Sequence, residues 1–430
     1  MKTFKYIFAA AALMVTGVYA QRPTPAPKQE KSVIIRNATI HIGNGNVIQN
    51  GVIAFDRGKI SLVADATTIR IDFRKYDEVM DAYGMHVYPG LIGLANNLGL
   101  TEIDMVRSTR DAYEVGEFNP NVRSVIAYNA DSRIIPTVRS NGVLLSQVVP
   151  AGDAITGSSS IMQLDAWNWE DATITADEGI WVVWPNMYIN RSPNAKPEEK
   201  QRERILNELA KLDQVFAEAK AYNESKMSET NLKFDAMKGL FNGSKKLYVL
   251  AYDVKAITAA LDFASRYQLT LVLVGANDAV MMADRIAKAG VPIILERMHR
   301  LPSRDEEPVD APYTLATKLT RAGVKVALSI DGSWQVRNLP FMAGTAAAHG
   351  LDKEEALQCI TLNPAQITGI DKNYGSLEQG KSATLILSTG DLLDMKSSKV
   401  TAAFIDGRKI DLNNHQTELN NQYNEKYGIH

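Results

Sequence analysis

The sequence predicts an α/β protein, a (β/α)8 TIM-like barrel joined to a small composite β-sandwich domain formed by both chain ends. Apolar strands alternate with helical segments through the middle of the chain, and short strands separated by turns lie near both ends. The chain has 430 residues, of which 45% are hydrophobic. This size and composition are ordinary for a large barrel with a second, smaller unit.

The first 20 residues have the pattern of a signal peptide. Lys2 and Lys5 precede a short apolar run at residues 7–15, and Ala20 is the small residue before the expected cleavage site. The apolar run is too short to span a bilayer comfortably, and a buried N-terminal helix is the alternative. We therefore predict an exported protein, periplasmic or envelope-associated and soluble. The Pro-rich residues 21–31 are predicted to form a flexible leader.

Residues 32–85 and 371–412 are predicted to form the composite β-sandwich domain. Turn sequences at residues 44–45 and 56–59 separate apolar strands in the first stretch, and Asp406-Gly407 is a hairpin turn in the second. The last stretch, residues 413–430, is predicted to be a polar tail.

Residues 86–370 are predicted to form the barrel. Near-continuous apolar strands with short connections are typical of a parallel sheet that is covered on both faces. A barrel fits the length, and a doubly wound open sheet is the alternative. Strands are expected at residues 247–251, 271–275, 291–295 and 324–330, and helices at 199–226, 256–267, 278–289 and 313–322.

Charge and cysteine content exclude several classes of protein. The chain has 47 basic and 49 acidic residues, a net charge of −2 and no basic block, so nucleic acid is not an expected partner. Cys359 is the only cysteine, which excludes an intrachain disulfide. Its amphipathic helical context is typical of a small core residue.

Three motifs carry a resemblance to a known family. Residues 87–97 read VYPGLIGLANN, residues 361–365 read TLNPA and residues 375–383 read GSLEQGKSA. The first resembles the opening barrel strand of the amidohydrolase superfamily, Pro-Gly-Leu-Ile-Asp-x-His-x-His, and the other two resemble the segment that follows the last barrel strand. The resemblance is greatest to the imidazolonepropionase-like branch and covers nearly all of the mature chain.

The resemblance implies a metal centre at the C-terminal ends of the barrel strands, but the family ligands are missing here. A hydrolytic zinc needs three or four nitrogen or oxygen donors and one open position. Residues 180–184, where the family has a carboxylated lysine or an acid, offer neither. The positions of the family's histidines are occupied by Ala95, by Asn97, by Leu250 and by either Val274 or Gly275. The position of the family's aspartate is occupied by Asp331. We therefore expect no metal cofactor, with Asp331 as the remaining trace.

The six histidines do not supply substitutes, because none falls on a ligand position of the family. Only His299, in the loop after residues 291–295, is placed to reach the barrel mouth, and a loop role near Pro302 is its alternative. The six are His41, His86, His299, His349, His415 and His430.

A replacement pocket is predicted among polar residues that follow the barrel strands. Asp331 is the candidate catalytic residue, since the resemblance implies that a carboxylate at this position takes a proton from water. A satisfied polar residue at a strand end is its alternative. Asp253 would form with it a metal-free acid/base pair or a site for a hard cation. The pocket residues are Asn96, Asn97, Tyr252, Asp253, Asn277, Glu296 and His299.

Residues 142–160 are expected to contain a Gly/Ser-rich loop after a strand. Backbone N–H groups of such a loop can cradle an anion. The segment lacks the lysine and the spacing of a nucleotide-binding loop, and its serines have no nearby His or Lys to activate them.

These observations lead to three functional hypotheses. The first is an exported protein of amidohydrolase fold that has lost its metal centre and acts as a non-catalytic binding or assembly subunit, as a homo-oligomer or beside a metal-competent amidohydrolase. The second is an active hydrolase of C–N bonds in peptide-like or cyclic amide substrates, with a site around Asp331. Only under this second hypothesis would a divalent metal be expected, and in the family that metal is zinc. The third is a binder of a small molecule in the old substrate pocket.

Overall fold

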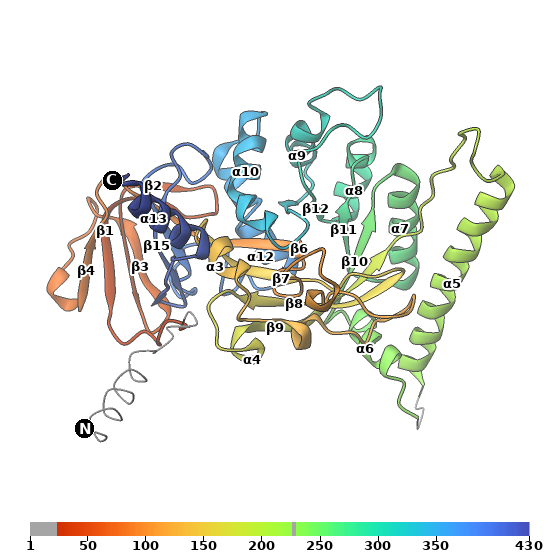
Figure 1. Ribbon diagram of the computed structural model, residues 1–430, viewed down its shortest axis with the longest axis horizontal. Helices are drawn as coiled ribbons and strands as arrows, with labels where there is room; N and C mark the ends of the chain where they lie inside the picture. The colour runs from red at the N-terminus through yellow and green to blue at the C-terminus, as the bar shows by residue number, and fades with distance from the viewer. Residues whose placement is uncertain (1–23, 226–228, 430) are drawn as a thin grey trace, which may run out of the picture.

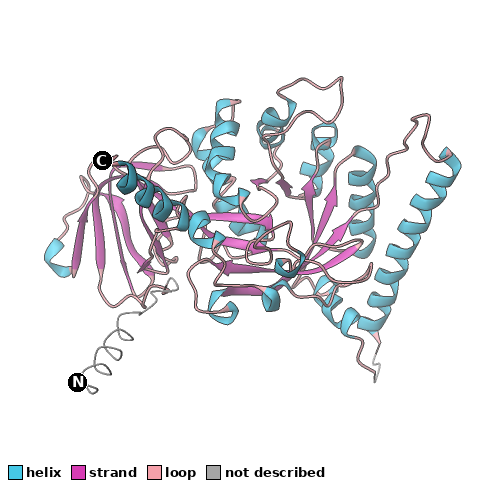
Figure 2. Cartoon of the chain, in the orientation of Figure 1, coloured by secondary structure: helices cyan, strands magenta, loops and turns pink. Residues whose placement is uncertain are grey.

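The computed structural model describes residues 24–225 and 229–429, and it contains two sheets with flanking helices (Figures 1 and 2). The predicted signal peptide and the first residues of the predicted leader lie outside the described residues. One sheet is built from both ends of the chain, and the other forms a nearly closed barrel from the middle. The predicted fold class is therefore confirmed.

The composite sheet joins the two ends of the chain through β5. Its order is β16-β15-β14-β5-β1-β2-β3, and β4 pairs with the first part of β1. β5 is parallel to β1 and antiparallel to β14, so the segment expected to open the barrel belongs to this sheet. The strands are β1 Val33–His41, β2 Val47–Asp56, β3 Lys59–Asp65, β4 Glu78–Asp81, β5 His86–Pro89, β14 Leu385–Ser388, β15 Val400–Ile405 and β16 Arg408–Lys409.

The core of the composite sheet consists of branched and aromatic side chains from both ends of the chain. Ile35, Val87 and Leu385 are fully buried, and Phe55 packs edge-to-face on Phe404 with ring centroids 5.1 Å apart. Alternation of side chains along each strand places these residues on one face. The two chain ends are thus held together by a shared apolar core.

The barrel sheet has the order β13-β12-β11-β10-β9-β8-β7-β6. Its pairs are parallel except that β8 runs antiparallel to both β7 and β9. The strands are β6 Leu91–Asn96, β7 Val143–Val148, β8 Ile155–Gln163, β9 Thr173–Val183, β10 Lys246–Ala251, β11 Leu271–Gly275, β12 Ile293–Leu295 and β13 Val326–Leu328.

The antiparallel strand β8 corrects the sequence analysis. Residues 155–160 of the expected Gly/Ser-rich loop belong to β8, whose residues are all buried, so they form no anion cradle. Their hydroxyl groups have partners inside the protein: Ser158 donates to the carbonyl of Pro120, and Ser159 donates to the carboxylate of Glu178. Small hydroxylated residues therefore fill this part of the barrel, a role that composition alone does not separate from a loop.

The barrel closes at a seam between β6 and β13. The segment after α11 (Lys353–Gln358) fills the seam, since Ile92 N donates to the carbonyl of Ile360 and Leu328 N donates to the carbonyl of Cys359. The Ser329 hydroxyl also donates to the carbonyl of Leu94. Cys359 is buried here, as expected for a core residue.

The helices lie mostly around the barrel (Figure 1). No helix among the described residues is long and apolar enough to cross a membrane. Residues 415–427 of the predicted polar tail form a helix, α13. Besides α11, the helices are α2 Ser124–Ala127, α3 Ile134–Arg139, α4 Trp169–Ala172, α5 Glu198–Glu224, α6 Leu232–Phe241, α7 Val254–Tyr267, α8 Ala283–Ala289, α9 Ala311–Arg321, α10 Leu339–Ala348, α12 Leu362–Thr368 and α13 His415–Tyr427, with 3-10 turns at Phe73–Lys75, Arg107–Thr109, Ala279–Met282 and Gln335–Asn338.

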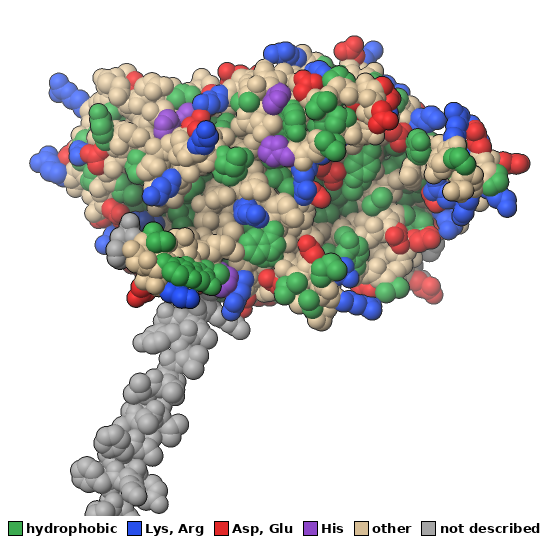
Figure 3. All heavy atoms as spheres, turned by 45° about the horizontal axis from the view of Figure 1, so that its top comes forward, with side chains coloured by type: hydrophobic (Ala, Val, Ile, Leu, Met, Phe, Trp, Pro, Cys, Tyr) green, Lys and Arg blue, Asp and Glu red, His purple; other side chains and the backbone are tan. Residues whose placement is uncertain are grey.

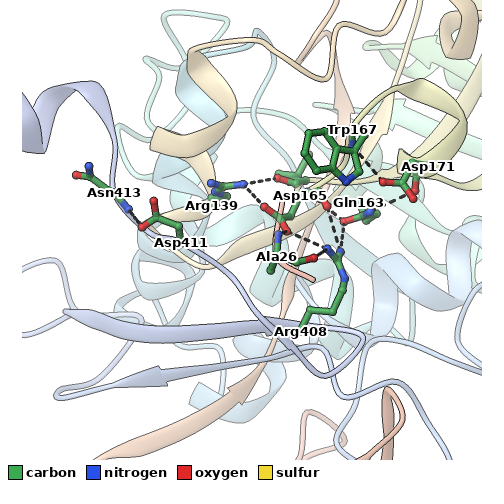
Figure 4. A network of polar contacts seen from close by, with 10 residues as sticks. Ala26, Arg139, Gln163, Asp165, Trp167, Asp171, Arg408, Asp411 and Asn413 are labelled. Atoms are coloured by element: carbon green, nitrogen blue, oxygen red, sulfur yellow. Dashed lines mark hydrogen bonds and ion pairs between the residues drawn. The ribbon is translucent and has the colours of Figure 1, made fainter. Parts of the chain in front are cut away.

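A buried ion cluster ties the leader, the composite sheet and the barrel together (Figure 4). The Asp165 carboxylate accepts from Arg139 at 2.7 Å, from Arg408 of β16 at 2.9 Å and from the backbone N–H of Ala26 at 2.9 Å. Gln29 also bonds to both β2 and the following turn. The described part of the leader is thus docked rather than flexible, because its backbone and side-chain polar groups have partners in the folded body.

Candidate site at the barrel mouth

The C-terminal ends of the barrel strands form the mouth, where the family resemblance places a metal. Ala95 lies near the end of β6 with a left-handed φ of 52°, and Asn97 follows the strand. Leu250 lies in β10 and Gly275 ends β11. Asp331 follows β13 as the one carboxylate of the family pattern.

These side chains do not suit a catalytic zinc. Alanine, leucine, valine and glycine have no side-chain donor, and an amide oxygen suits hard cations better than zinc. Among residues 24–225 and 229–429, no group of three or more His, Cys, Asp or Glu side chains could hold a metal ion. The donor set at the mouth therefore does not fit the family's metal centre.

The two asparagines after Ala95 have different surroundings. The Asn96 amide donates to the carbonyls of Gly93 and Leu94, and its oxygen accepts from Ser146. Both polar atoms of this side chain therefore have partners within the fold. The Asn97 amide donates to Thr101, whereas its oxygen is buried without a partner. Of this predicted pair, only Asn97 retains an unused polar atom.

Two carboxyl groups and a tyrosine meet at the mouth. The half-buried Glu296 follows β12 and is hydrogen-bonded to Tyr252. Burial, and next the nearby Asp331 carboxylate, raise the pKa of Glu296. The Asp331 side chain is 61% exposed and lies 3.4 Å from Arg297. Two carboxyl groups thus lie in one polar group, one with a raised pKa and one exposed, an arrangement that can give and take protons.

Tyr252 is held over β11 by a close approach to Gly275. A Cβ added at Gly275 would lie 2.4 Å from a Tyr252 ring carbon, and the φ of Gly275 is +82°. Burial, followed by the adjacent Glu296 carboxyl, raises the pKa of the Tyr252 hydroxyl. Tyr252 is therefore a neutral hydroxyl at the mouth.

Three other predicted pocket residues have partners that direct them elsewhere. The Asp253 carboxylate caps α7 by accepting from the N–H groups of Lys255 and Ala256, which is the usual task of an aspartate at this position. Asn277 accepts from Arg300 at 2.8 Å. His299 bonds to Thr345 of α10 at 2.7 Å and lines a groove of about 690 Å³ beside that helix. The Asp253 carboxylate is thus engaged at α7, and Glu296 is the carboxyl group that lies near Asp331.

The largest polar feature inside the barrel was missed by the sequence analysis. Glu178 of β9 is buried and accepts from Gln147 at 2.6 Å, from Ser159 at 2.5 Å and from the Tyr248 hydroxyl at 2.8 Å. Burial raises the pKa of this carboxyl, while the three donors oppose the shift. Gln147 also accepts from the Ala95 N–H, so this buried hub reaches the end of β6.

An aromatic pair fills the space beside Glu178. Trp181 of β9 stacks on Tyr248 of β10 with ring centroids 4.7 Å apart and planes 5° apart. Both side chains are at most 2% exposed, and they belong to the apolar cluster inside the barrel. The sequence signal for the hub is the acidic residue directly before Gly179, two positions before residues 180–184, where the resemblance places a metal ligand.

Large apolar side chains are exposed on the segments that follow the barrel strands. Figure 3 turns the upper side of Figure 1 toward the viewer, and hydrophobic side chains line a hollow on this face. Exposed apolar side chains on one face often mark a binding surface. Those on the segments after β6, β9, β10, β11 and β12 are Ile103, Met105, Val106, Tyr113, Val115, Tyr188, Tyr252, Val280, Met281, Leu301 and Val309.

Comparisons with known proteins agree with this architecture. The family model described as the amidohydrolase family matches residues 269–410. Imidazolonepropionase from Flavobacterium psychrophilum is 36% identical over 84 residues, 19% of this chain and 20% of the relative. Imidazolonepropionase from Symbiobacterium thermophilum is 41% identical over 86 residues, again 19% of this chain and 20% of the relative. The matched stretches thus span about a fifth of these curated relatives.

Solved structures share the fold over most of the chain. An amidohydrolase from Thermotoga maritima has a TM-score of 0.76 at 20% identity and covers 88% of this chain and 99% of its own. Molinate hydrolase has a TM-score of 0.54 at 14% identity and covers 90% and 96%. At these identities the likeness concerns the fold.

The barrel with its composite sheet is the fold shared with the Thermotoga maritima amidohydrolase and, at a lower TM-score, with molinate hydrolase. The family match, the relatives and the shared fold agree with one another. Over residues 269–410 the chain is similar to the amidohydrolase family, and over about a fifth of its length it is similar to imidazolonepropionases.

Proposed function

We propose that this chain is an exported amidohydrolase-superfamily protein that lacks a catalytic metal centre and acts as a non-catalytic binding or assembly subunit. One observation carries the proposal: the strand ends where the family binds metal present Ala95, Leu250 and Gly275, which have no donor atoms in their side chains. Fewer than three suitable donors cannot hold a catalytic zinc.

Two further features support a binding role. The interior of the barrel next to β6 is packed with the Trp181–Tyr248 pair and the Glu178 hub rather than left as a polar cavity. The segments around the mouth expose large apolar side chains such as Met105 and Val115, with 93% and 90% exposure. A surface of this kind suits a protein partner, either a second copy of the chain or a metal-competent amidohydrolase.

Metal content tests the loss of the metal centre. The protein, purified without chelators from cells grown with zinc, manganese and iron, is expected to contain far less than one transition metal ion per chain by elemental analysis. A metal-competent imidazolonepropionase purified in parallel is the control. About one tightly bound metal per chain would overturn the proposal.

Affinity purification from the native envelope tests export and assembly together. The tagged chain is expected in the envelope or periplasmic fraction without its first residues, and mass spectrometry is expected to find a partner in stoichiometric amount. Substitution of Met105 and Val115 by serine is expected to reduce that partner's yield. Recovery of the full-length chain from the cytoplasm alone contradicts export.

A second function is favoured by the paired carboxyl groups at the mouth. Glu296 has a raised pKa and Asp331 is an exposed carboxylate. In a metal-free hydrolysis of a C–N bond, Asp331 takes the proton of a water whose oxygen attacks the carbonyl carbon. Glu296 gives a proton to the nitrogen that leaves as the bond breaks. Peptide-like or cyclic amides are the substrate class.

Two conservative variants distinguish this alternative. If the chain is a hydrolase of this kind, Asp331→Asn and Glu296→Gln each lower kcat at least about a hundredfold, the usual loss when a general acid or base is removed. Asp253→Asn is the matched control, because this carboxylate caps α7. Unchanged turnover in both mouth variants rules the alternative out.

A further inference from the structure

A second junction between the composite sheet and the barrel is made of histidines. His41 lies at the end of β1 and His86 at the start of β5. His41 Nδ1 is 2.7 Å from Glu354 Oε1 of α11, and its Nε2 is 3.0 Å from His86 Nδ1. The three side chains therefore form a chain of hydrogen bonds that leads from the sheet to a helix of the barrel.

His41 and Glu354 are largely shielded from water, whereas His86 is partly exposed. His41 is 9% exposed and stacks on Tyr88 of β5 with ring centroids 4.3 Å apart. Lys353 of α11 forms an ion pair with Asp391, which lies just after β14. The charged and titratable groups that face the histidines are therefore Tyr88, Lys353, Glu354 and Asp391. The second oxygen of Glu354 is buried without a partner.

The hydrogen bond between the two histidines tolerates one added proton on the pair but not two. An ionised Glu354 only accepts hydrogen bonds, so His41 donates to it from Nδ1. With one proton shared between the histidines, the bond between Nε2 of His41 and Nδ1 of His86 persists, since one nitrogen donates and the other accepts. With both histidines charged, two N–H groups face each other across 3.0 Å and the bond is lost.

Helix α11 connects this junction to the barrel seam. Glu354 lies in its first turn, and the residues directly after its last turn are Cys359 and Ile360. Their carbonyls accept from Leu328 of β13 and Ile92 of β6. A displacement of this six-residue helix would therefore loosen the contact between the two strands that lead to Ala95 and Asp331.

The other junction between sheet and barrel has no such sensitivity. It consists of Arg139, Asp165 and Arg408, and the arginines keep their charge at every physiological pH. The two junctions differ in whether their charge changes near neutral pH. Acid should therefore release one side of the sheet while the other side stays attached.

We propose that His41, His86 and Glu354 form an acid-sensitive clasp that opens when both histidines are protonated and thereby frees α11 and loosens the barrel seam. The clasp is a conformational device that is independent of whether the barrel mouth binds or hydrolyses a ligand. Its opening would change the groove beside α10, which Lys353 and Asp391 line together with His299.

The expected direction follows from the pKa of His86. Burial, and next the neighbouring His41, lower this pKa. The neutral form of His86 is thus favoured in the folded protein, and its contribution to stability is complete above the unfolded pKa of about 6.5. As pH falls below that value, the unfolded or opened form binds more protons than the closed form. The contribution of His86 to stability therefore declines until pH reaches the lowered folded-state pKa.

Hydrogen–deuterium exchange of the intact protein tests the clasp. After correction for intrinsic exchange, peptides covering residues 353–361 are expected to exchange severalfold faster at about pH 5.5 than at about pH 7.5, the range in which histidine charge changes. Peptides covering residues 163–166, at the arginine junction, serve as the internal control and should change little. Equal behaviour of the two junctions in the wild-type protein overturns the proposal without need of any variant.

Two variants assign the effect to the clasp. His86→Gln keeps polar atoms at this place but does not titrate, so the acid response of residues 353–361 should disappear. His415→Gln, at the exposed start of α13, should keep the full response. An acid response that persists in His86→Gln overturns the clasp. Slowing of exchange by zinc that a chelator reverses also overturns it, because the histidines would then hold a metal.

Discussion

Glu178 inside the barrel and Glu296 at its mouth are glutamates in barrel strands or directly after them, and burial raises the carboxyl pKa of both. Their surroundings differ. Glu178 is 5% exposed and has three donors, from β7, β8 and β10. Glu296 is hydrogen-bonded to a partly exposed tyrosine and lies near the exposed Asp331. A raised pKa therefore does not by itself mark a site. Access to a ligand separates the structural carboxyl from the candidate one.

Removal of the buried carboxyl should have the largest effect. Glu178→Ala leaves the donors of Gln147, Ser159 and Tyr248 without an acceptor and opens a cavity, and so we expect a loss of about 3 kcal/mol or more in the free energy of unfolding. Urea denaturation measures this loss. A loss below about 1 kcal/mol would show that the hub is not structural.

The isosteric variant Glu178→Gln gives the pH dependence of the hub. Because the folded-state pKa is raised, the wild-type contribution of Glu178 is fully present below the unfolded pKa of about 4.3 and declines as pH rises toward the folded-state value. The stability gap between wild type and Glu178→Gln should thus narrow as pH rises. Urea denaturation at several pH values checks the sign, and a gap that widens contradicts it.

A glycine exchange at the mouth should have the next largest effect. Gly275→Ala places a Cβ against the Tyr252 ring at a left-handed φ of +82°, while Gly323→Ala has the same φ with nothing within 4 Å. We expect each variant to lose about 1 kcal/mol from backbone strain and Gly275→Ala to lose roughly 1–2 kcal/mol more. Thermal unfolding compares them, and equal losses would mean that Tyr252 is free to move away.

The helix-capping carboxylate should have a smaller effect. Asp253→Ala removes the acceptor for two N–H groups of α7 and is expected to cost about 1 kcal/mol, with no change in ligand or partner binding. Asn231→Ala at the start of α6 is a matched capping control. Loss of binding in Asp253→Ala alone would return this residue to the candidate site.

The mouth carboxyl should matter least for stability. Glu296→Gln is expected to change the free energy of unfolding by less than about 0.5 kcal/mol at low pH, where the raised pKa of Glu296 favours the neutral carboxyl that the amide resembles. Since the folded-state pKa of Glu296 is raised, any advantage of the glutamine variant should grow with pH. Urea denaturation at pH 5 and 8 measures this trend. A large loss at low pH would place Glu296 beside Glu178 as a structural group.

Sequence patterns predicted the fold better than they predicted the site. The apolar strands, the turns near both ends and the motifs around residues 87–97 and 361–383 were sufficient for the barrel and the composite sheet. β8 was missed because its serines resemble a loop until their partners, such as Glu178, are known. Asp253 and Asp331 both follow strands, so only the capping bonds of Asp253 separate their roles.

The sequence by itself determined which side chains occupy the family's ligand positions, and those of Ala95 and Leu250 lack donors in any conformation. Tertiary structure alone decided which polar groups meet, since residues far apart in the chain come together only when the strands close into a barrel. The Glu178 hub and the clasp of His41, His86 and Glu354 are contacts of this kind. Their partners lie 70 and 313 positions apart in the chain, beyond the reach of local pattern and propensity.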